Sequence, residues 1–336
     1  MQSLPASATS HHGGKSSRNA APVRRFIAVG ALRFARSTIA SLVKLAVGRQ
    51  PHFTAHDVLF RQYVAHRLGF DTLREITAVH SPHEGAGSQA LMTMNAIRFA
   101  RAHGLTYIHT PFSRIHHADR LDREWAAAWE EFFNLGDGEA RAARSPVNYA
   151  FTCAELWALF GVTPYQPFDE ELRRDFRRKY RANKAPRRAA GFNVCIHVRR
   201  RNPHDFHDED VTDMSRLIPV VARLRTLMSE RQVPCTLKVF SQGPWPDAAA
   251  LGVSESELFV DADPIWTLRE LIDADLLVTT KGTFSYVAGL LCAGAVIADP
   301  LQFPPQPDWV PYDAAGVFDA VSLRRRLDAA AAASPG

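Results

Sequence analysis

Residues 191–210 read GFNVCIHVRRRNPHDFHDED and join an apolar segment to three consecutive arginines. Residues 192–198 are mostly apolar and β-branched, which is typical of a strand buried in a sheet. Arg199, Arg200 and Arg201 follow directly at its carboxyl end. Adjacent guanidinium groups repel one another, and Arg is suited to bidentate contacts with phosphate oxygens. The pattern therefore predicts a diphosphate site at the end of this strand.

The rest of the second half alternates between short apolar strands and helices. Expected strands cover residues 192–198, 236–241, 258–261, 275–280 and 295–300, and expected helices cover residues 213–231, 264–274 and 283–294. This alternation is typical of a parallel sheet covered by helices on both faces. Such sheets bind ligands at the carboxyl ends of their strands, so the three arginines lie at the expected binding edge.

The preceding part of the chain shows the same alternation. Strands are expected at residues 75–80 and 105–110, joined by the glycine loop EGAGSQ and a helix that starts near Ala90, and a further helix at residues 123–136. Residues 173–188 hold nine Lys or Arg and one Asp, which indicates a helix end and an interdomain linker with a solvated basic face. The prediction is an α/β protein with a basic extension (1–50), a first Rossmann-like domain (51–185) and a second (186–330).

Composition places the chain among soluble globular proteins, with 336 residues, 46% apolar and 22% charged. Its four cysteines show no zinc-binding spacing, so we interpret them as buried, reduced thiols of a cytoplasmic protein. Residues 1–50 carry eight Lys or Arg and no acid, and subtracting these eight from the net charge of +5 leaves −3. The basic character thus belongs to the N-terminus.

Two interpretations remain open for that N-terminus. Residues 1–24 are rich in Ser, Ala and Gly and are expected to be disordered. In residues 25–49 the charges of Arg33, Arg36 and Lys44 interrupt the apolar run, which argues against a membrane-spanning helix. This segment is a basic amphipathic helix on the inner face of a membrane in one interpretation. In the other it is a helix that packs on the protein, or an extension without a function.

Two further stretches suit an anion. The strand that ends at Thr280 is followed by Lys281, Gly282 and a helix starting near Thr283. Backbone N–H groups at a helix start bind anions, and Thr283 and Ser285 add hydroxyl donors, although Thr283 is equally suited to an ordinary helix cap. The glycine loop at residues 84–89 allows close approach of a backbone to a ligand, but it lacks the full dinucleotide-binding and P-loop patterns.

Together these motifs resemble one family. HVRRR (197–201) resembles the H-x-R-R motif of the α1,2-, α1,6- and protein O-fucosyltransferase superfamily, EGAGSQ is similar to its G-x-G-N-Q loop, and ADLLVTTKGTFSYVAGLL (274–291) is similar to its S-S-F-S strand–helix segment. LKVFSQG (237–243) resembles the strand between these motifs, so the resemblance covers about residues 76–300 in order. It implies a GT-B-like fold with two Rossmann-like domains facing a cleft. It also implies an inverting, metal-independent and cofactor-independent transfer of fucose from GDP-fucose to a glycan.

The resemblance also implies roles for individual residues. The diphosphate would be bound by the arginine strand and by the later strand–helix turn, through His197, Arg199, Arg200, Lys281, Thr283, Phe284 and Ser285. The glycine loop would face the donor across the cleft, through Gly85, Gly87, Ser88 and Gln89. Side chains alternate along a strand, so His197 and Arg199 should share one side while Arg200 points to the other. One arginine would then contact phosphate while another braces the loop.

The remaining candidates carry open alternatives. Glu84 is the first candidate for the general base, with His204 and Asp205 behind it, and Arg199 is expected to stabilise the transition state. Glu84 is otherwise a solvated loop acid or a partner of a helix N-terminus, and the arginines otherwise pair with acids of residues 205–210. Asp261 and Asp263 either meet the guanine edge or cap the helix near Pro264, with the cap favoured. His109, His116 and His117 are interpreted as acceptor-cleft or core histidines rather than as metal ligands.

Two other functions compete with the transferase. The departures at Ser88 and Asn202 from the family motifs motivate a non-catalytic protein that binds sugar nucleotides or glycans. The basic residues 173–188 motivate binding to nucleic acid, but no aromatic motif accompanies them, so we expect no nucleic-acid partner.

Overall fold

The computed structural model describes residues 75–80, 83–116, 123–141, 150–151, 166–185, 191–201, 211–230, 234–243, 245, 248–300 and 303–333. The chain divides into two compact units, Met1–Gln62 and Tyr63–Gly336, and every described residue belongs to the second. The expected basic extension and the candidates His117, His204 and Asp205 lie outside the described residues. None of the described helices is both long and apolar enough to cross a bilayer.

A six-stranded parallel sheet forms the C-terminal half. Its strands are β5 (Phe192–His197), β6 (Cys235–Ser241), β7 (Leu258–Val260), β8 (Leu276–Thr279), β9 (Ala295–Ala298) and β10 (Val310–Pro311). They are joined in the order β10-β9-β8-β5-β6-β7, and every pair is parallel. The chain moves from β5 outward through β6 and β7, then returns to the other side of β5 for β8 and continues to β9. The topological switch point therefore lies between β5 and β8.

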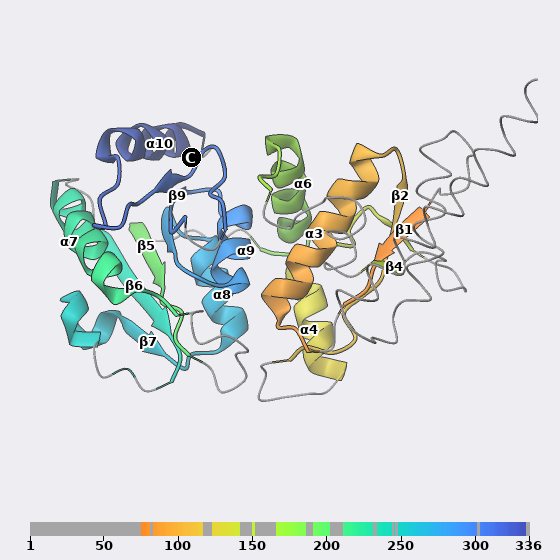
Figure 1. Cartoon of the computed structure of the whole chain (residues 1–336), viewed down its shortest axis with the longest axis horizontal. Helices are drawn as coiled ribbons and strands as arrows, with labels where there is room; N and C mark the ends of the chain where they lie inside the picture. Colours follow the sequence, from red (N-terminus) through yellow and green to blue (C-terminus); the bar gives the residue numbers. More distant parts are fainter. Residues whose placement is uncertain are drawn as a thin grey trace, which may run out of the picture. The chain divides into compact units, whose positions relative to one another are not determined.

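Helices cover both faces of this sheet, as the apolar strands predict. They are α7 (Met214–Glu230), α8 (Pro264–Ile272), α9 (Thr283–Leu291) and α10 (Ala320–Ala333), with short 3-10 turns at Ala248–Leu251 and Glu255–Glu257. In Figure 1, α7 and α10 lie on one face of the sheet and α8 and α9 on the other. The α/β class with parallel sheets and covering helices is thus confirmed.

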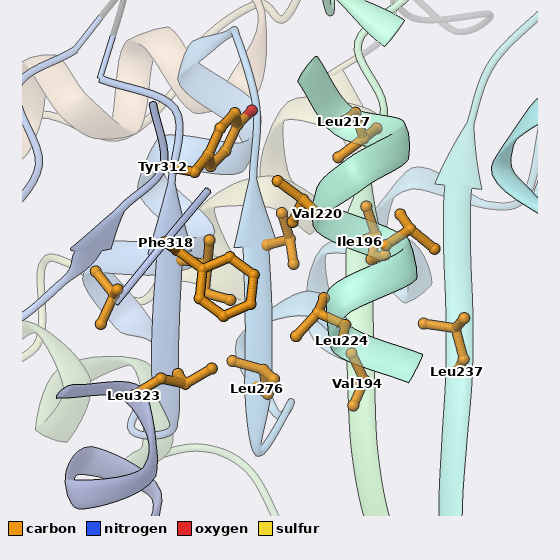
Figure 2. Close-up of a cluster of buried hydrophobic side chains, with 14 of the residues drawn as sticks. Val194, Ile196, Leu217, Val220, Leu224, Leu237, Leu276, Tyr312, Phe318 and Leu323 are labelled. Atoms are coloured by element: carbon orange, nitrogen blue, oxygen red, sulfur yellow. The ribbon is translucent and has the colours of Figure 1, made fainter. Parts of the chain in front are cut away.

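Alternation along β5 divides its side chains between these two faces. Val194 and Ile196 are fully buried in a cluster with Leu217, Val220 and Leu224 of α7, and Figure 2 shows these side chains together with Phe318 and Leu323. Cys195 points to the other face, where its thiol donates a hydrogen bond to the Glu270 carbonyl of α8 at 3.4 Å. Burial of each such apolar side chain stabilises the fold by roughly 1.5–3 kcal/mol.

A second parallel sheet lies N-terminal to the first. It consists of β1 (Glu75–Ala78), β2 (Thr106–His109), β3 (Ala140–Arg141) and β4 (Ala150–Phe151), in the order β3-β2-β1-β4. Its helices are α3 (Ala86–Ala102), α4 (Arg123–Phe133) and α6 (Glu170–Arg181). The strands β3, β4 and β10 were not expected, because two residues carry no readable periodicity, and α10 was not assigned either. The domain boundaries at residues 50 and 185 stay predictions.

The helix α3 begins inside the glycine loop, at Ala86 rather than near Ala90. Gly85 takes the N-cap position with an extended backbone, and no side chain caps the helix there. The other end agrees better with expectation, since the helix stops at Ala102 and Gly104 follows with a φ of 65°. A positive φ of this size favours glycine, which is why Gly104 marks the end of the helix.

The basic stretch around α6 is only in part the solvated face that its composition suggested, since Arg174, Arg178 and Arg181 are exposed while other members are buried. Lys179 is buried, pairs with Glu139 and donates to the Leu135 carbonyl at 3.1 Å. Arg178 pairs with Asp137 at 2.8 Å, and Arg173 pairs with Glu170 and with Asp308. Glu170 is a neighbour within α6, but Asp137, Glu139 and Asp308 come from distant parts of the sequence, so the charge run could not reveal them. Among the seven described Lys and Arg of the stretch, four pair with acids: Arg173, Arg177, Arg178 and Lys179.

The cysteines agree in part with the prediction. Cys195 and Cys292 are buried free thiols, and burial raises the pKa of Cys292 to about 12. Cys235 is only half-buried, and Cys153 lies outside the described residues.

Candidate functional site

The arginine strand and the later strand–helix turn meet at the switch point. The Arg199 backbone N–H donates to the Thr212 hydroxyl at 2.8 Å, and the Thr280 hydroxyl donates to the His197 carbonyl at 2.8 Å. A Cβ atom added to Gly282 would lie 3.6 Å from Cδ of Arg199, so this side chain packs on the turn before α9. The structure thus brings together two sites that are about 80 residues apart in the sequence.

The turn between β8 and α9 is built from Thr280, Gly282 and Ser285. Gly282 has a φ of 103°, which a side chain would strain, and it begins α9 without a side-chain cap. The Ser285 hydroxyl accepts from the Thr280 N–H at 3.1 Å and donates to the Thr280 carbonyl at 3.0 Å. Ser285 is fully buried, so its hydroxyl holds the turn. The N–H groups of the first turn of α9 are the better diphosphate donors.

His197 contributes a neutral ring to this site. Its ring centre lies 5.3 Å from that of Phe284, the second residue of α9. Burial, helped by the positive charge of Arg199, lowers the pKa of His197 to about 3. The imidazole is therefore neutral at physiological pH, and its buried Nδ1 finds no hydrogen-bond partner within the described structure. His197 and Arg199 both face α9, as their alternation predicted.

Arg200 leaves the strand on the other side. Its guanidinium lies over the ring of Trp245, 5.8 Å from the ring centre, beyond the end of β6. This position confirms the predicted split between consecutive arginines. Whether Arg200 contacts phosphate, as the family resemblance implies, stays a prediction. Lys281 and Thr283 are half-buried beside the turn, and Arg201 is exposed.

The glycine loop packs directly on α9. A Cβ atom on Gly87 would lie 2.8 Å from the Phe284 nitrogen and 3.0 Å from the Thr283 carbonyl carbon. Gln89 is fully buried and donates to the carbonyls of Glu84 at 2.9 Å and Arg114 at 2.7 Å. Both residues therefore have packing roles. Gly85 and Ser88 are half-buried, and their contact with a donor stays a prediction.

Glu84 precedes this loop and has an altered acidity. Desolvation raises the pKa of its carboxyl group, and a hydrogen bond from the Ser88 side chain partly opposes the shift. A raised pKa makes a carboxylate a stronger base, which suits general-base catalysis. Because Glu84 lies three residues before Gly87, it belongs to the loop that contacts the first turn of α9.

The two aspartates that could contact the guanine of the donor, Asp261 and Asp263, bond to nearby backbone N–H groups. The Asp263 carboxylate accepts from the Trp266 N–H at 2.7 Å and caps α8, which begins at Pro264, so the favoured cap is confirmed. Asp261 accepts from the Gly243 N–H at 2.7 Å, which links the loops that follow β6 and β7. Contact of either residue with guanine stays a prediction.

The histidines near the first sheet are core or loop residues. His109 is buried and bonds to Glu130 at 2.5 Å, and the His116 backbone N–H donates to the Glu84 carbonyl at 3.1 Å. His80, which the sequence analysis did not single out, bonds through Nε2 to Thr93 at 2.9 Å, and burial lowers its pKa to about 4. Across the described ranges, no three His, Cys, Asp or Glu side chains are grouped to hold a metal ion.

Several residues of the site escaped the sequence analysis. Thr212 and Trp245 are single residues in loops, and no motif marks them. Thr280 was seen only as the end of a strand. The one available signal was position, since Trp245 follows the carboxyl end of a strand in the same sheet.

Comparisons with known proteins give weak likenesses. No protein-family model matches the chain, and no curated protein matches it. The iron-containing dodecameric glycosyltransferase TibC from enterotoxigenic E. coli is 13% identical, over 74% of this chain and 65% of that one, with a TM-score of 0.42. The fucosyltransferase NodZ from Bradyrhizobium is 12% identical, over 74% of this chain and 98% of that one, with a TM-score of 0.33. The E. coli heptosyltransferase WaaC with ADP is 12% identical, over 78% of this chain and 98% of that one, with a TM-score of 0.33. The chain thus spans 65% of the length of the first. At TM-scores below 0.5, these likenesses assign neither a family nor an activity to this chain.

Proposed function

We propose that this chain is a glycosyltransferase that moves a sugar from a nucleoside diphosphate donor to a glycan acceptor, with GDP-fucose as the expected donor. One observation carries the proposal: the Arg199 side chain packs on Gly282, at the start of α9, where β5 and β8 end side by side. In open parallel sheets, ligands bind at the carboxyl ends of the strands beside a switch point.

The chemistry at this point suits a diphosphate. Arg199 supplies a guanidinium group, and α9 supplies first-turn N–H groups with the positive end of its dipole. The start of α3 adds to this charge distribution, because Gly87 packs on the same turn and Gly85 leaves α3 without a side-chain cap. Two helix starts and one arginine therefore direct positive potential at one place.

These groups also account for catalysis in the proposal. As the sugar departs, the leaving diphosphate gains negative charge, and preorganised positive groups stabilise this transition state more than the ground state. Glu84 is proposed to take the proton from the acceptor hydroxyl. The hydroxyl oxygen attacks the anomeric carbon of the sugar from the face opposite the diphosphate, which leaves, and the configuration at that carbon is inverted. In this scheme residues 186–330 bind the donor and residues 51–185 bind the acceptor, without a metal ion.

The first prediction is a donor preference that depends on Arg199. Thermal unfolding of the full chain with GDP-, UDP- and ADP-sugars should show stabilisation by one donor, about 2.7 kcal/mol at a hundredfold excess over Kd. Arg199→Gln should lower the affinity for that donor about 10- to 100-fold, because a charge-assisted hydrogen bond contributes about 1.5–3 kcal/mol. Arg225→Gln is the matched control. Arg225 pairs with Glu257, with 2.7 Å between the charged atoms, and this pair does not belong to the proposed donor site.

Absence of stabilisation by every donor at millimolar concentration would contradict the proposal. Binding that Arg199→Gln leaves unchanged would place the donor elsewhere. A protein that binds the donor but neither hydrolyses it nor transfers its sugar to a panel of glycans would instead be a non-catalytic sugar-nucleotide binder.

A further inference from the structure

Two consecutive arginines leave β5 in opposite directions. Arg199 packs on Gly282, on the side of β8 and α9. The Arg200 guanidinium lies over the ring of Trp245, on the side of β6. The edge of the sheet therefore carries an arginine on each side of β5, and of these two only Arg199 is accounted for by the diphosphate.

Trp245 provides a fixed surface beneath Arg200. Its indole is half-buried and packs against the large hydrophobic cluster between the sheet and α7. Anchoring against the core restricts the ring, and the ring restricts the guanidinium above it. A guanidinium that lies over one aromatic ring leaves another face open, on which a further planar π system can stack.

Asp261 holds the residues that directly follow β6, shortly before Trp245. The Asp261 carboxylate accepts from the Gly243 N–H at 2.7 Å, and the Asp261 N–H donates to the Ser241 carbonyl at 3.0 Å. Asp261 adopts a φ of 54°, in the left-handed region that few residues other than glycine occupy. Such backbone strain persists where the surrounding structure enforces it, often near functional sites. Asp261 thus fixes the segment two residues before Trp245.

We propose that Arg200 and Trp245 form the platform on which the base of the donor nucleotide stacks, with Asp261 as a positioning residue. This inference rests on the proposed function, because it places the base on the β6 side of β5 while the diphosphate lies on the β8 side. Stacking increases with the area of the planar ring system, so the platform favours a purine over a pyrimidine nucleotide. It selects the base without reading its hydrogen-bonding edge.

The test compares nucleotide with bare diphosphate. Calorimetric titration of the full chain with GDP, UDP and inorganic pyrophosphate should show GDP bound most tightly. Trp245→Leu should lower the affinity for GDP about 10-fold, as expected for the loss of one stacking contact. It should lower the affinity for pyrophosphate less than about twofold. Arg200→Lys, which keeps the charge but not the planar group, should show the same split. Trp245→Phe, which keeps an aromatic ring, should stay within about threefold of the wild type for both ligands.

The outcomes separate the platform from the diphosphate site. Melting temperatures of the variants exclude unfolding, and Arg200→Lys still tests the platform if Trp245→Leu proves unstable. The proposed platform is contradicted if Trp245→Leu and Arg200→Lys bind GDP with the affinity of the wild type. It is also contradicted if both variants lose affinity for GDP and for pyrophosphate equally. A wild type that binds pyrophosphate as tightly as GDP overturns the platform and leaves the diphosphate site standing. A wild type that binds neither overturns the proposed function as well.

Discussion

Single atoms determine how closely the parts of the candidate site approach one another. At Gly87 the missing Cβ allows the first turn of α3 to touch the backbone of Thr283 and Phe284. At Gly282 the backbone φ of 103° starts α9 beside Arg199 without a side chain in between. Both glycines therefore decide where the groups that are proposed to bind the ligand are placed.

The Gly87→Ala substitution tests this at one position. Helix propensity alone predicts that alanine inside α3 stabilises the protein by up to about 1 kcal/mol. The added methyl group would instead meet rigid backbone atoms of α9 at 2.8–3.0 Å, and overpacking of this kind costs about 1–3 kcal/mol. We expect the free energy of unfolding in urea to fall. An increase would show that α3 and α9 do not pack this closely.

The helices at the sheet edge differ in how they begin. Asp263 caps α8 through the Trp266 N–H, and Pro264 occupies the first helical turn. In contrast, α9 begins at Gly282 without a side-chain cap, and Ser285 turns back to Thr280. A capped helix has satisfied part of its donor groups internally, whereas an uncapped one retains them for a ligand. This difference favours α9 over α8 as the anion-binding element.

The prediction for α8 concerns stability and not ligand choice. Asp263→Ala should lower the free energy of unfolding by about 1 kcal/mol, within the 0.5–2 kcal/mol range of lost caps. Asp263→Asn should be nearly neutral, because asparagine caps as well as aspartate. Chemical denaturation measures both variants, and nucleotide titration serves as the control. A change of preferred nucleotide in Asp263→Asn would revive the interpretation of Asp263 as a residue that contacts the base.

Buried polar contacts join the segment at the start of α6 to α9 and to the segment that follows β9. Gln306 is buried, accepts from the Phe168 N–H at 2.8 Å and donates to the Tyr286 hydroxyl at 2.6 Å. Arg173 of α6 pairs with Asp308, a neighbour of Gln306. Segments before α6 and after β9 are therefore joined through groups whose polar atoms have little access to water. Such contacts contribute little while intact and cost much when broken.

Gln306→Leu is expected to weaken this connection. Leucine fills a similar volume but leaves the Phe168 N–H without its acceptor, which costs about 1–3 kcal/mol. Arg225→Gln, which removes a partly exposed ion pair with Glu257, should cost less than about 1 kcal/mol. Both values come from the same denaturation experiment. Equal effects of the two substitutions would show that Gln306 does not link these segments.

Local pattern was enough to predict the β-strands, their covering helices and the placement of the arginines at a carboxyl edge. Apolar periodicity depends on neighbouring residues alone, and alternation placed His197 and Arg199 opposite Arg200 without further information. It failed for the two-residue strands β3, β4 and β10, and it did not identify the helix α10. Contacts between distant residues depend on how the elements pack, so only the tertiary structure revealed the partners of the basic residues in α6, the packing of Gly87 on Phe284 and the position of Trp245 under Arg200.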